Sequence, residues 1–456
     1  MGDVAPTRVD PDLRAGAEWL GGPAGAHRGS PGFWTPLRVI LLTGTAVFWL
    51  GVIRTVPCMV NGWGDPDRYE HLCYSDIPVL YSLRGLADGM VPYLEWPQGS
   101  HPLEYPVLIG LTMYVSALIV SVLGMVGNAV SFYLVTMVIL YAFFLLALVA
   151  VSRTVTNRPW DGLLLALSPV VFFASTVNWD WPAIAFTAAS LWVWSRKLPF
   201  WAGILLGLAI AAKFYPVLLL GPLLLLCLRA GRLGDWAKYL GGAVVGWLVV
   251  NIPFMIANTE GWQYFFTFSA DRGQDFGSVW LAFQTFGFGV PADSINTVAL
   301  VTFLVACIGI AVVILMAPTR PRVGQVSFLI VAAFLITNKV YSPQFVLWLL
   351  PLAILARPRW RDIIWWQFAE VIYFISIWWY LVGLTDGAKG LPEQWYAVAI
   401  MVHVLATLAL AGLVVRDIFW PSGDPVRVDR PDHTDDPGGG VLDGAPDRFA
   451  LRSSAG

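Results

Sequence analysis

The stretch that decides the fold, residues 105–152, reads YPVLIGLTMYVSALIVSVLGMVGNAVSFYLVTMVILYAFFLLALVAVS and contains no Asp, Glu, Lys or Arg over 48 residues. A membrane-spanning helix needs about 20 consecutive apolar residues. The stretch is therefore long enough for two helices, and we expect the break between them at Gly127 and Asn128. It predicts helices that are surrounded by a lipid bilayer.

The composition of the whole chain supports the same class of protein. Of its 456 residues, 57% are hydrophobic and only 13% are charged, whereas soluble domains carry about 25% charged residues. These values exclude a disordered chain, a collagen, a disulfide-rich miniprotein and an ordinary cytosolic enzyme. The formal net charge of −2 points to neither nucleic acid nor a basic partner.

Charge-poor runs of helix length recur between residues 37 and 415, so we expect an all-α, multi-pass membrane protein with about 12 transmembrane helices. So many spans leave too little chain for a separate soluble catalytic domain. Any chemistry must then be built from loops and helix ends at the membrane surface. The tails, residues 1–36 and 416–456, are rich in Gly, Pro and charged residues and are expected to be disordered.

The orientation follows from the short loops, because Lys and Arg accumulate on the cytoplasmic side of a membrane. Twelve basic residues fall at one set of alternate helix ends: Arg153, Arg158, Arg196, Lys197, Arg229, Arg232, Lys238, Arg320, Arg322, Arg357, Arg359 and Arg361. Both tails are then cytoplasmic, and the segment 58–104 lies outside. We expect residues 105–126 to form a helix that enters from the outer face without crossing.

The outer segment 58–104 is too long for a simple connection, since loops beyond about 12–15 residues are usually functional or disordered. Its apolar spacing from Ile77 to Leu86 suits a short surface helix, so the segment is expected to be ordered against the bilayer. Cys58 and Cys73 lie near its start. A disulfide would restrict the loop, and two free, packed cysteines remain the alternative.

Asp76 lies directly before this expected helix and has two compatible interpretations. Either Ser75 or Asp76 can cap the helix by accepting backbone hydrogen bonds in its first turn. Alternatively, Asp76 is a carboxylate held at the membrane–water boundary as a general base. Capping would fix the orientation that a base needs.

The remaining polar residues of the outer face come from separate turns that the topology brings to one side. Asp180 and Lys213 lie at two short turns, Arg272 in the segment 258–296, and Lys339 at a later turn. Each cation alone is explained by an interfacial side chain that reaches water. Together they suit an anionic headgroup, and Arg offers bidentate contact with phosphate. The histidines and cysteines lack zinc spacing, so no cofactor is expected, and a divalent metal stays open.

Four motifs in this order resemble the membrane glycosyltransferases of the GT-C superfamily, over about residues 39–415. They are Tyr74-Ser75-Asp76-Ile77, His101-Pro102-Leu103-Glu104-Tyr105-Pro106, Lys213-Phe214-Tyr215-Pro216, and the turn 339–344 that leads into residues 345–351. The last motif is similar to the actinobacterial family-87 type, which includes mannosyltransferases that depend on polyprenyl-phosphate-mannose.

The resemblance implies a sugar donor on polyprenyl phosphate and a glycolipid or glycan acceptor, used at the extracytoplasmic face of the plasma membrane. The family's catalytic acid maps onto Asp76, and a second acidic position maps onto Asp180. Many relatives carry a paired acid where this chain has Ser75, which puts a metal-binding pair in doubt. For such a donor, the three cations Arg272, Lys339 and Lys213 are expected to bind the phosphate. Other substrate contacts are expected from Asp180, Tyr341, Gln344, His101 and Glu104.

A membrane transporter or lipid flippase is the main alternative. Transporters tend to have inverted repeats and broken helices in both halves, and no second segment of this sequence resembles residues 58–104. The polar candidates also gather on one face, away from the bilayer midplane. We therefore expect an inverting glycosyltransferase, with mannose as the expected sugar and arabinofuranosyl or glucosyl transfer left open.

Overall fold

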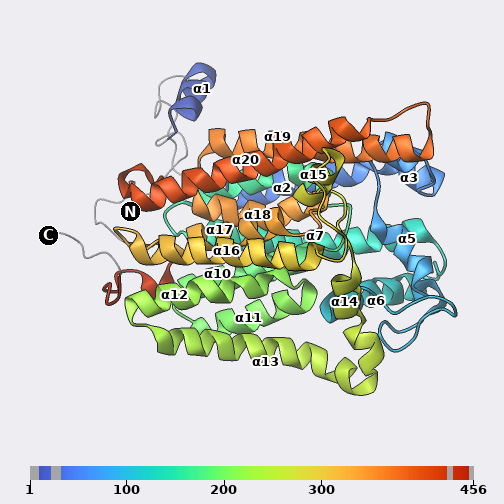
Figure 1. Cartoon of the computed structure of the whole chain (residues 1–456), viewed down its shortest axis with the longest axis horizontal. Helices are drawn as coiled ribbons and strands as arrows, with labels where there is room; N and C mark the ends of the chain where they lie inside the picture. The colour runs from blue at the N-terminus through green and yellow to red at the C-terminus, as the bar shows by residue number, and fades with distance from the viewer. Residues whose placement is uncertain (1–9, 22–31, 429–434, 451–456) are drawn as a thin grey trace.

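The computed structural model describes residues 10–21, 32–428 and 435–450, and every regular element in these ranges is helical (Figure 1). The prediction of an all-α protein is confirmed. Most helices run along the long axis of the molecule as a bundle. Helices α3 (Val56–Asn61), α5 (Asp76–Leu83) and α14 (Thr259–Asp271) lie toward one end of this bundle, on the right in Figure 1.

Six helical stretches are long and apolar enough to cross a membrane, which confirms a multi-pass protein. They are α2 (Pro36–Arg54) continued by α3, α7 (Ala129–Thr154), α13 (Leu233–Ala257), α16 (Ile295–Met316), α19 (Trp360–Thr385) and α20 (Glu393–Phe419). Shorter apolar helices complete the bundle: α6 (Val107–Val122), α11 (Pro199–Ala212), α12 (Leu220–Ala230), α17 (Val323–Thr337) and α18 (Val346–Ala356). Helix α10 (Trp181–Ser195) packs against α7 and α11. A total of twelve crossings remains a prediction.

The break in the long uncharged stretch falls where the sequence predicts it. Helix α6 ends at Val122 and α7 begins at Ala129. Gly127 adopts a positive φ of 78°, and the Asn128 side chain accepts a hydrogen bond of 2.9 Å from the backbone nitrogen of Ser131. Asparagine is a favoured N-cap because it satisfies an unpaired amide of the first turn.

Helices α11 and α13 pack closely through small residues. A Cβ atom added to Gly203 would lie 2.0 Å from the carbonyl oxygen of Tyr239, and one added to Gly207 would lie 2.2 Å from that of Ala243. Such contacts are impossible for any larger residue. Small residues in membrane helices bring backbones together where the hydrophobic effect does not drive association.

The acidic segment 58–104 carries short helices, among them α4 (Asp67–Glu70) and α5. Cys58 and Cys73, for which the sequence left a bridge and two free thiols open, form a disulfide. We call this end of the bundle the acidic end. The opposite end carries the twelve Lys and Arg residues of the alternate turns and is called the basic end.

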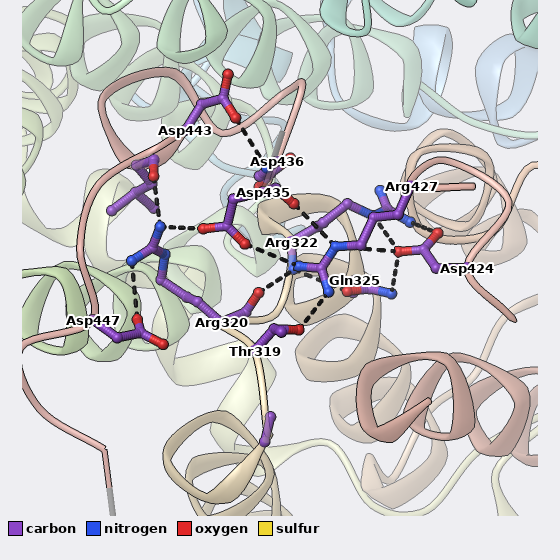
Figure 2. A network of polar contacts seen from close by, with 12 residues as sticks. Thr319, Arg320, Arg322, Gln325, Asp424, Arg427, Asp435, Asp436, Asp443 and Asp447 are labelled. Atoms are coloured by element: carbon purple, nitrogen blue, oxygen red, sulfur yellow. Dashed lines mark hydrogen bonds and ion pairs between the residues drawn. The ribbon is translucent and has the colours of Figure 1, made fainter. Parts of the chain in front are cut away.

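The expectation of a solvated tail from Arg416 onward is wrong for the described part of that segment. Helix α20 continues to Phe419, and residues 420–428 and 435–450, which we call the strap, pack on the basic end beside α12 (Figures 1 and 2). Asp424 and Asp436 are 0% and 4% exposed. The reason is electrostatic, because buried arginines need counter-charges.

The buried arginines of the basic end are Arg158, Arg229, Arg320, Arg322 and Arg357. Arg322 binds Asp424 at 2.7 and 2.9 Å, and Arg229 binds Asp447 at 2.7 Å. Figure 2 shows the strap aspartates around Arg320 and Arg322. In the expected N-terminal tail, the structure describes helix α1 (Pro11–Gly21), whereas residues 1–9 and 22–31 lie outside the described residues.

Candidate functional site

Asp76 is the first residue of α5, and its neighbour performs the capping. The Ser75 hydroxyl accepts a hydrogen bond of 3.3 Å from the backbone nitrogen of Ile77. The backbone nitrogen of Asp76 donates to the carbonyl of Val177 at 2.9 Å. Ser75 thus satisfies the helix end, and the Asp76 carboxylate remains available for other contacts.

Two side chains hold that carboxylate. The Tyr74 hydroxyl donates to Oδ1 of Asp76 at 2.6 Å, and Nδ2 of Asn178 donates to Oδ2 at 2.6 Å. Burial by surrounding residues raises the pKa of the Asp76 carboxyl above its ordinary value, while these two hydrogen bonds and the charge of Lys213 act in the opposite direction. The result is a carboxylate of fixed orientation and increased basicity.

Asn178 also connects Asp76 to a cation, Lys213, which pairs with a second carboxylate, Asp180. Nζ of Lys213 donates to Oδ1 of Asn178 at 3.2 Å and lies 3.4 Å from Oδ1 of Asp180. Oδ1 of Asp180 also accepts a hydrogen bond of 2.8 Å from the Trp348 indole. Its other oxygen, Oδ2, is buried and has no hydrogen-bond partner among the described residues.

Tyr105 connects this cluster to the acidic segment. Nδ2 of Asn178 lies 2.6 Å from the Tyr105 hydroxyl, and Nζ of Lys213 lies 4.9 Å from the centre of the Tyr105 ring. Lys213 thus makes a cation–π contact as well as its ion pair. We call Asp76, Asn178, Asp180, Lys213 and Tyr105 the carboxylate cluster.

Aromatic rings from distant helices enclose the cluster. Trp378 of α19 stacks on Tyr74 with ring centres 4.7 Å apart. Trp348 of α18 stacks on Tyr215 at 4.4 Å and on Phe345 at 3.9 Å. The Lys213–Pro216 motif and residues 345–348 therefore meet at Asp180, although more than 100 residues separate them along the chain.

His101 and Glu104 form a separate group with Arg84. Arg84 binds the Glu104 carboxylate in a bidentate manner at 2.8 and 2.9 Å, and its Nη2 lies 3.2 Å from Nε2 of His101. The His101 ring stacks on Tyr264 of α14 at 4.9 Å. This ion pair fixes the chain directly before Tyr105 and so supports the carboxylate cluster.

Arg272 and Lys339 lie near one another but are bound to other groups. Nε of Arg272 donates to Asp275 at 2.8 Å, and Nζ of Lys339 donates to the carbonyl of Ala270 at 3.0 Å. Burial, and then the charge of Arg272, lowers the pKa of Lys339. In the described part of the chain, neither side chain forms a hydrogen bond or ion pair with Asp76, Asp180 or Lys213.

Tyr341 and Gln344 are buried, and Tyr341 belongs to another polar group inside the bundle. The Tyr341 ring lies 4.5 Å from the His403 ring, and its carbonyl accepts a hydrogen bond of 3.2 Å from the Tyr373 hydroxyl. Nδ1 of His403 lies 3.5 Å from the Glu370 carboxylate. Of the predicted site residues, the structure thus unites Asp76, Asp180 and Lys213.

Three residues that the sequence left without a role complete these groups: Asn178, Tyr105 and Arg84. Asn178 lies two residues before Asp180, and Tyr105 directly follows Glu104. Their positions beside predicted site acids were the signal that could have identified them. Arg84 gave no such signal, since its partner Glu104 lies 20 residues away. Among the described residues, no group of three or more His, Cys, Asp or Glu side chains could hold a metal ion.

The comparison with known protein families gives a match that covers much of this region. Residues 105–337, just over half of the 456, match the model of glycosyltransferase family 87. The matched region contains Tyr105, Asn178, Asp180 and Lys213 of the carboxylate cluster. No curated protein matches the chain. The extent of the family match shows that this chain belongs to glycosyltransferase family 87.

Proposed function

We propose that this glycosyltransferase moves mannose from a polyprenyl phosphate to a lipid-linked or glycolipid acceptor, with inversion, at the extracytoplasmic face of the plasma membrane. The observation that carries the proposal is the carboxylate cluster, in which a polarised carboxylate and a buried cation share one asparagine at an end of a membrane bundle. No observation favours the transporter or flippase alternative.

In this proposal, Asp76 is the general base. A base must be deprotonated and oriented toward the hydroxyl from which it takes the proton. Tyr74 and Asn178 supply the orientation, and burial raises the pKa of Asp76, which makes its carboxylate a stronger base. The acceptor oxygen forms the new bond to the anomeric carbon while its proton passes to Asp76.

The bond between the anomeric carbon and the phosphate oxygen breaks in the same step, and the electron pair leaves with the polyprenyl phosphate. Lys213 is the cation placed to stabilise that charge, since fixed charges at a site with little water act strongly on developing charge. A single displacement inverts the anomeric centre, so a β-linked mannosyl donor gives an α-mannoside.

Mostly apolar side chains beside the cluster line a crevice of only about 10 Å³, which would have to widen to admit a prenyl chain. Its lining includes Pro106, Val107, Ile210, Phe214, Trp247 and Phe266, from α6, α11, α13, α14 and neighbouring turns. Pro106 follows Tyr105 and Phe214 follows Lys213 along the chain. A phosphate near Lys213 would therefore lie beside apolar side chains, against which the tail of a lipid-linked donor would pack.

The test is a transfer assay with the purified full-length protein and a membrane glycolipid acceptor. Labelled mannose, arabinose and glucose are each supplied on polyprenyl phosphate, and mannose is also supplied on a nucleotide. We expect transfer from polyprenyl-phosphate-mannose with an inverted anomeric linkage. Transfer from the nucleotide sugar alone, or a product that retains the donor configuration, would contradict the proposal.

A further inference from the structure

The basic end contains a hollow of about 320 Å³ between the strap and two turns of the bundle. Its walls are Lys197 after α10, residues 230–232 between α12 and α13, and residues 441–448 of the strap, Leu442 and Asp447 excepted. Ligand pockets in proteins range from about 300 to 1,000 Å³. The hollow is therefore large enough for a small ligand headgroup.

Positive charge predominates in the lining. Lys197, Arg232 and Arg448 reach the hollow from three separate segments, against one acid, Asp443. Asp443 accepts a hydrogen bond of 3.0 Å from the backbone of Asp436, and Arg232 pairs with Asp235 at 2.9 Å. Lys197 and Arg448 are exposed, and over the described ranges neither has an ion pair. Two cations thus face the hollow without an ion pair in the described ranges.

The strap wall is held in place by the buried arginines. The backbone nitrogen of Arg448 donates to the carbonyl of Arg229 at 2.7 Å, and the Arg229 side chain binds Asp447 at 2.7 Å. Asp447 also binds Arg320 at 3.0 Å (Figure 2). The residue before Arg448 is therefore held by two buried arginines, and the backbone of Arg448 itself is hydrogen-bonded to Arg229.

Apolar side chains beside the hollow indicate where it opens. Leu198, which follows Lys197, is 49% exposed, and Leu233, which follows Arg232, is 43% exposed. Trp201, a few residues further, is 61% exposed. Exposed leucines suit lipid, and Trp is enriched at membrane–water boundaries. Two of the cations that line the hollow are thus followed along the chain by exposed apolar side chains, a combination that suits a membrane–water boundary.

From these observations we infer that the hollow binds the phosphate of an anionic phospholipid headgroup in the leaflet at the basic end. Basic pockets between membrane helices on the cytoplasmic side are suited to such headgroups. Inorganic phosphate or a soluble phosphate ester has the same charged group but lacks acyl chains that would contact the exposed apolar side chains beside the hollow. This second site is separate from the carboxylate cluster and does not depend on the proposed transferase reaction.

Native mass spectrometry of the full-length protein, titrated with dioleoylphosphatidylglycerol and with dioleoylphosphatidylcholine, tests the site. We expect one tightly held phosphatidylglycerol, and K197Q and R448Q should each weaken it about fivefold, given about 1 kcal/mol per basic residue near anionic lipid. R361Q is the matched control, because Arg361 is a 60% exposed cation at the same end but does not line the hollow. Equal weakening by all three variants, or no preference over phosphatidylcholine, would overturn the inference.

A second arm separates the two sources of phosphate. Inorganic phosphate and glycerol 3-phosphate are added at millimolar concentration to the phosphatidylglycerol complex. We expect the lipid to remain bound, because its apolar chains contribute contacts that the soluble ions lack. Displacement by either ion would show a soluble-phosphate site and contradict the lipid assignment. Unchanged thermal unfolding of K197Q and R448Q excludes misfolding as the cause of weaker binding.

Discussion

At the basic end, the arginine side chains that are buried meet carboxylates or carbonyls with short contacts, as in the Arg322–Asp424 pair, whose side chains are 2% and 0% exposed. At the acidic end, one carboxyl oxygen of Asp180 has no partner among the described residues, and Lys213 is shared between Asp180 and Asn178. Buried charges that are fully matched favour a structural role, whereas a buried carboxyl oxygen without a partner among the described residues is a candidate contact for a substrate. The comparison favours a structural role for the buried pairs of the basic end, and the proposed chemistry lies at the acidic end.

The sharpest way to break this comparison is to remove one partner of the matched pair. Arg322→Met leaves Asp424 buried with only the more distant Arg427, at 3.9 Å, as a counter-charge, and loss of one partner of a buried pair costs about 3–5 kcal/mol. We expect a large drop in the free energy of unfolding of the full-length protein and an unchanged transfer rate per folded molecule.

The exposed Arg361, which pairs with Asp362, provides the control. Arg361→Gln should change the free energy of unfolding by no more than about 0.5 kcal/mol. If R322M unfolds like the wild type, the buried pairs of the basic end do not stabilise the fold.

At the acidic end, Lys213→Met should lower the rate of sugar transfer. Loss of one preorganised electrostatic contact to developing charge costs about 10²–10³ in kcat. We expect a loss of this size in transfer by K213M, with thermal unfolding measured in parallel. Lys389→Met, which removes a 56% exposed lysine that pairs with Glu70, should keep its activity. Equal rates for both variants would place Lys213 outside the chemistry.

The acidic segment is held by a disulfide between Cys58 and Cys73, whereas the strap is held by ion pairs. The Cys58→Ser/Cys73→Ser variant opens a loop with a sequence separation of 15. Closing a loop of that length stabilises a fold by about 3 kcal/mol in the chain-entropy model. We expect a loss of that order in the free energy of unfolding, and little change for Cys307→Ser. An unfolding curve insensitive to reducing agent would contradict this role.

Much of this arrangement follows from local sequence. The helices, the break at Gly127 and Asn128, and the gathering of Asp76, Asp180 and Lys213 depend on apolar run length and on which turns share a face. The role of the strap did not follow, because an aspartate in a Gly- and Pro-rich tail has the composition of a solvated residue. Its partners, such as Arg322 for Asp424, lie about 100 residues away.

Arg272 and Lys339 show the limit of arguments from topology. Both share a face with Asp76 in the sequence interpretation, yet local partners hold them, such as Asp275 for Arg272. Topology gives the side of the membrane but not the position on it. Tyr105 shows the reverse case, since its contact with Asn178 joins residues 73 positions apart that no short motif links.

The smallest expected effect concerns pH. The Tyr74 hydroxyl lowers the pKa of Asp76 by donating to its charged form, so Tyr74→Phe should raise that pKa further. Because the base acts only when deprotonated, the acid limb of kcat/KM should move upward by about one pH unit. Tyr69→Phe, at a ring that stacks on Tyr74, is the control. A downward shift or none in Y74F would exclude this hydrogen bond from the chemistry.

The role of Asp76 is tested most directly by single-turnover transfer with the Asp76→Asn variant of the full-length protein, since asparagine keeps the shape and loses the base. We predict a fall of about 10²–10⁴ in rate, the usual contribution of a general base, with an unchanged thermal unfolding curve. Asp88→Asn, at an exposed acid of the same segment, should transfer like the wild type. A D76N rate within threefold of the wild type would contradict the account.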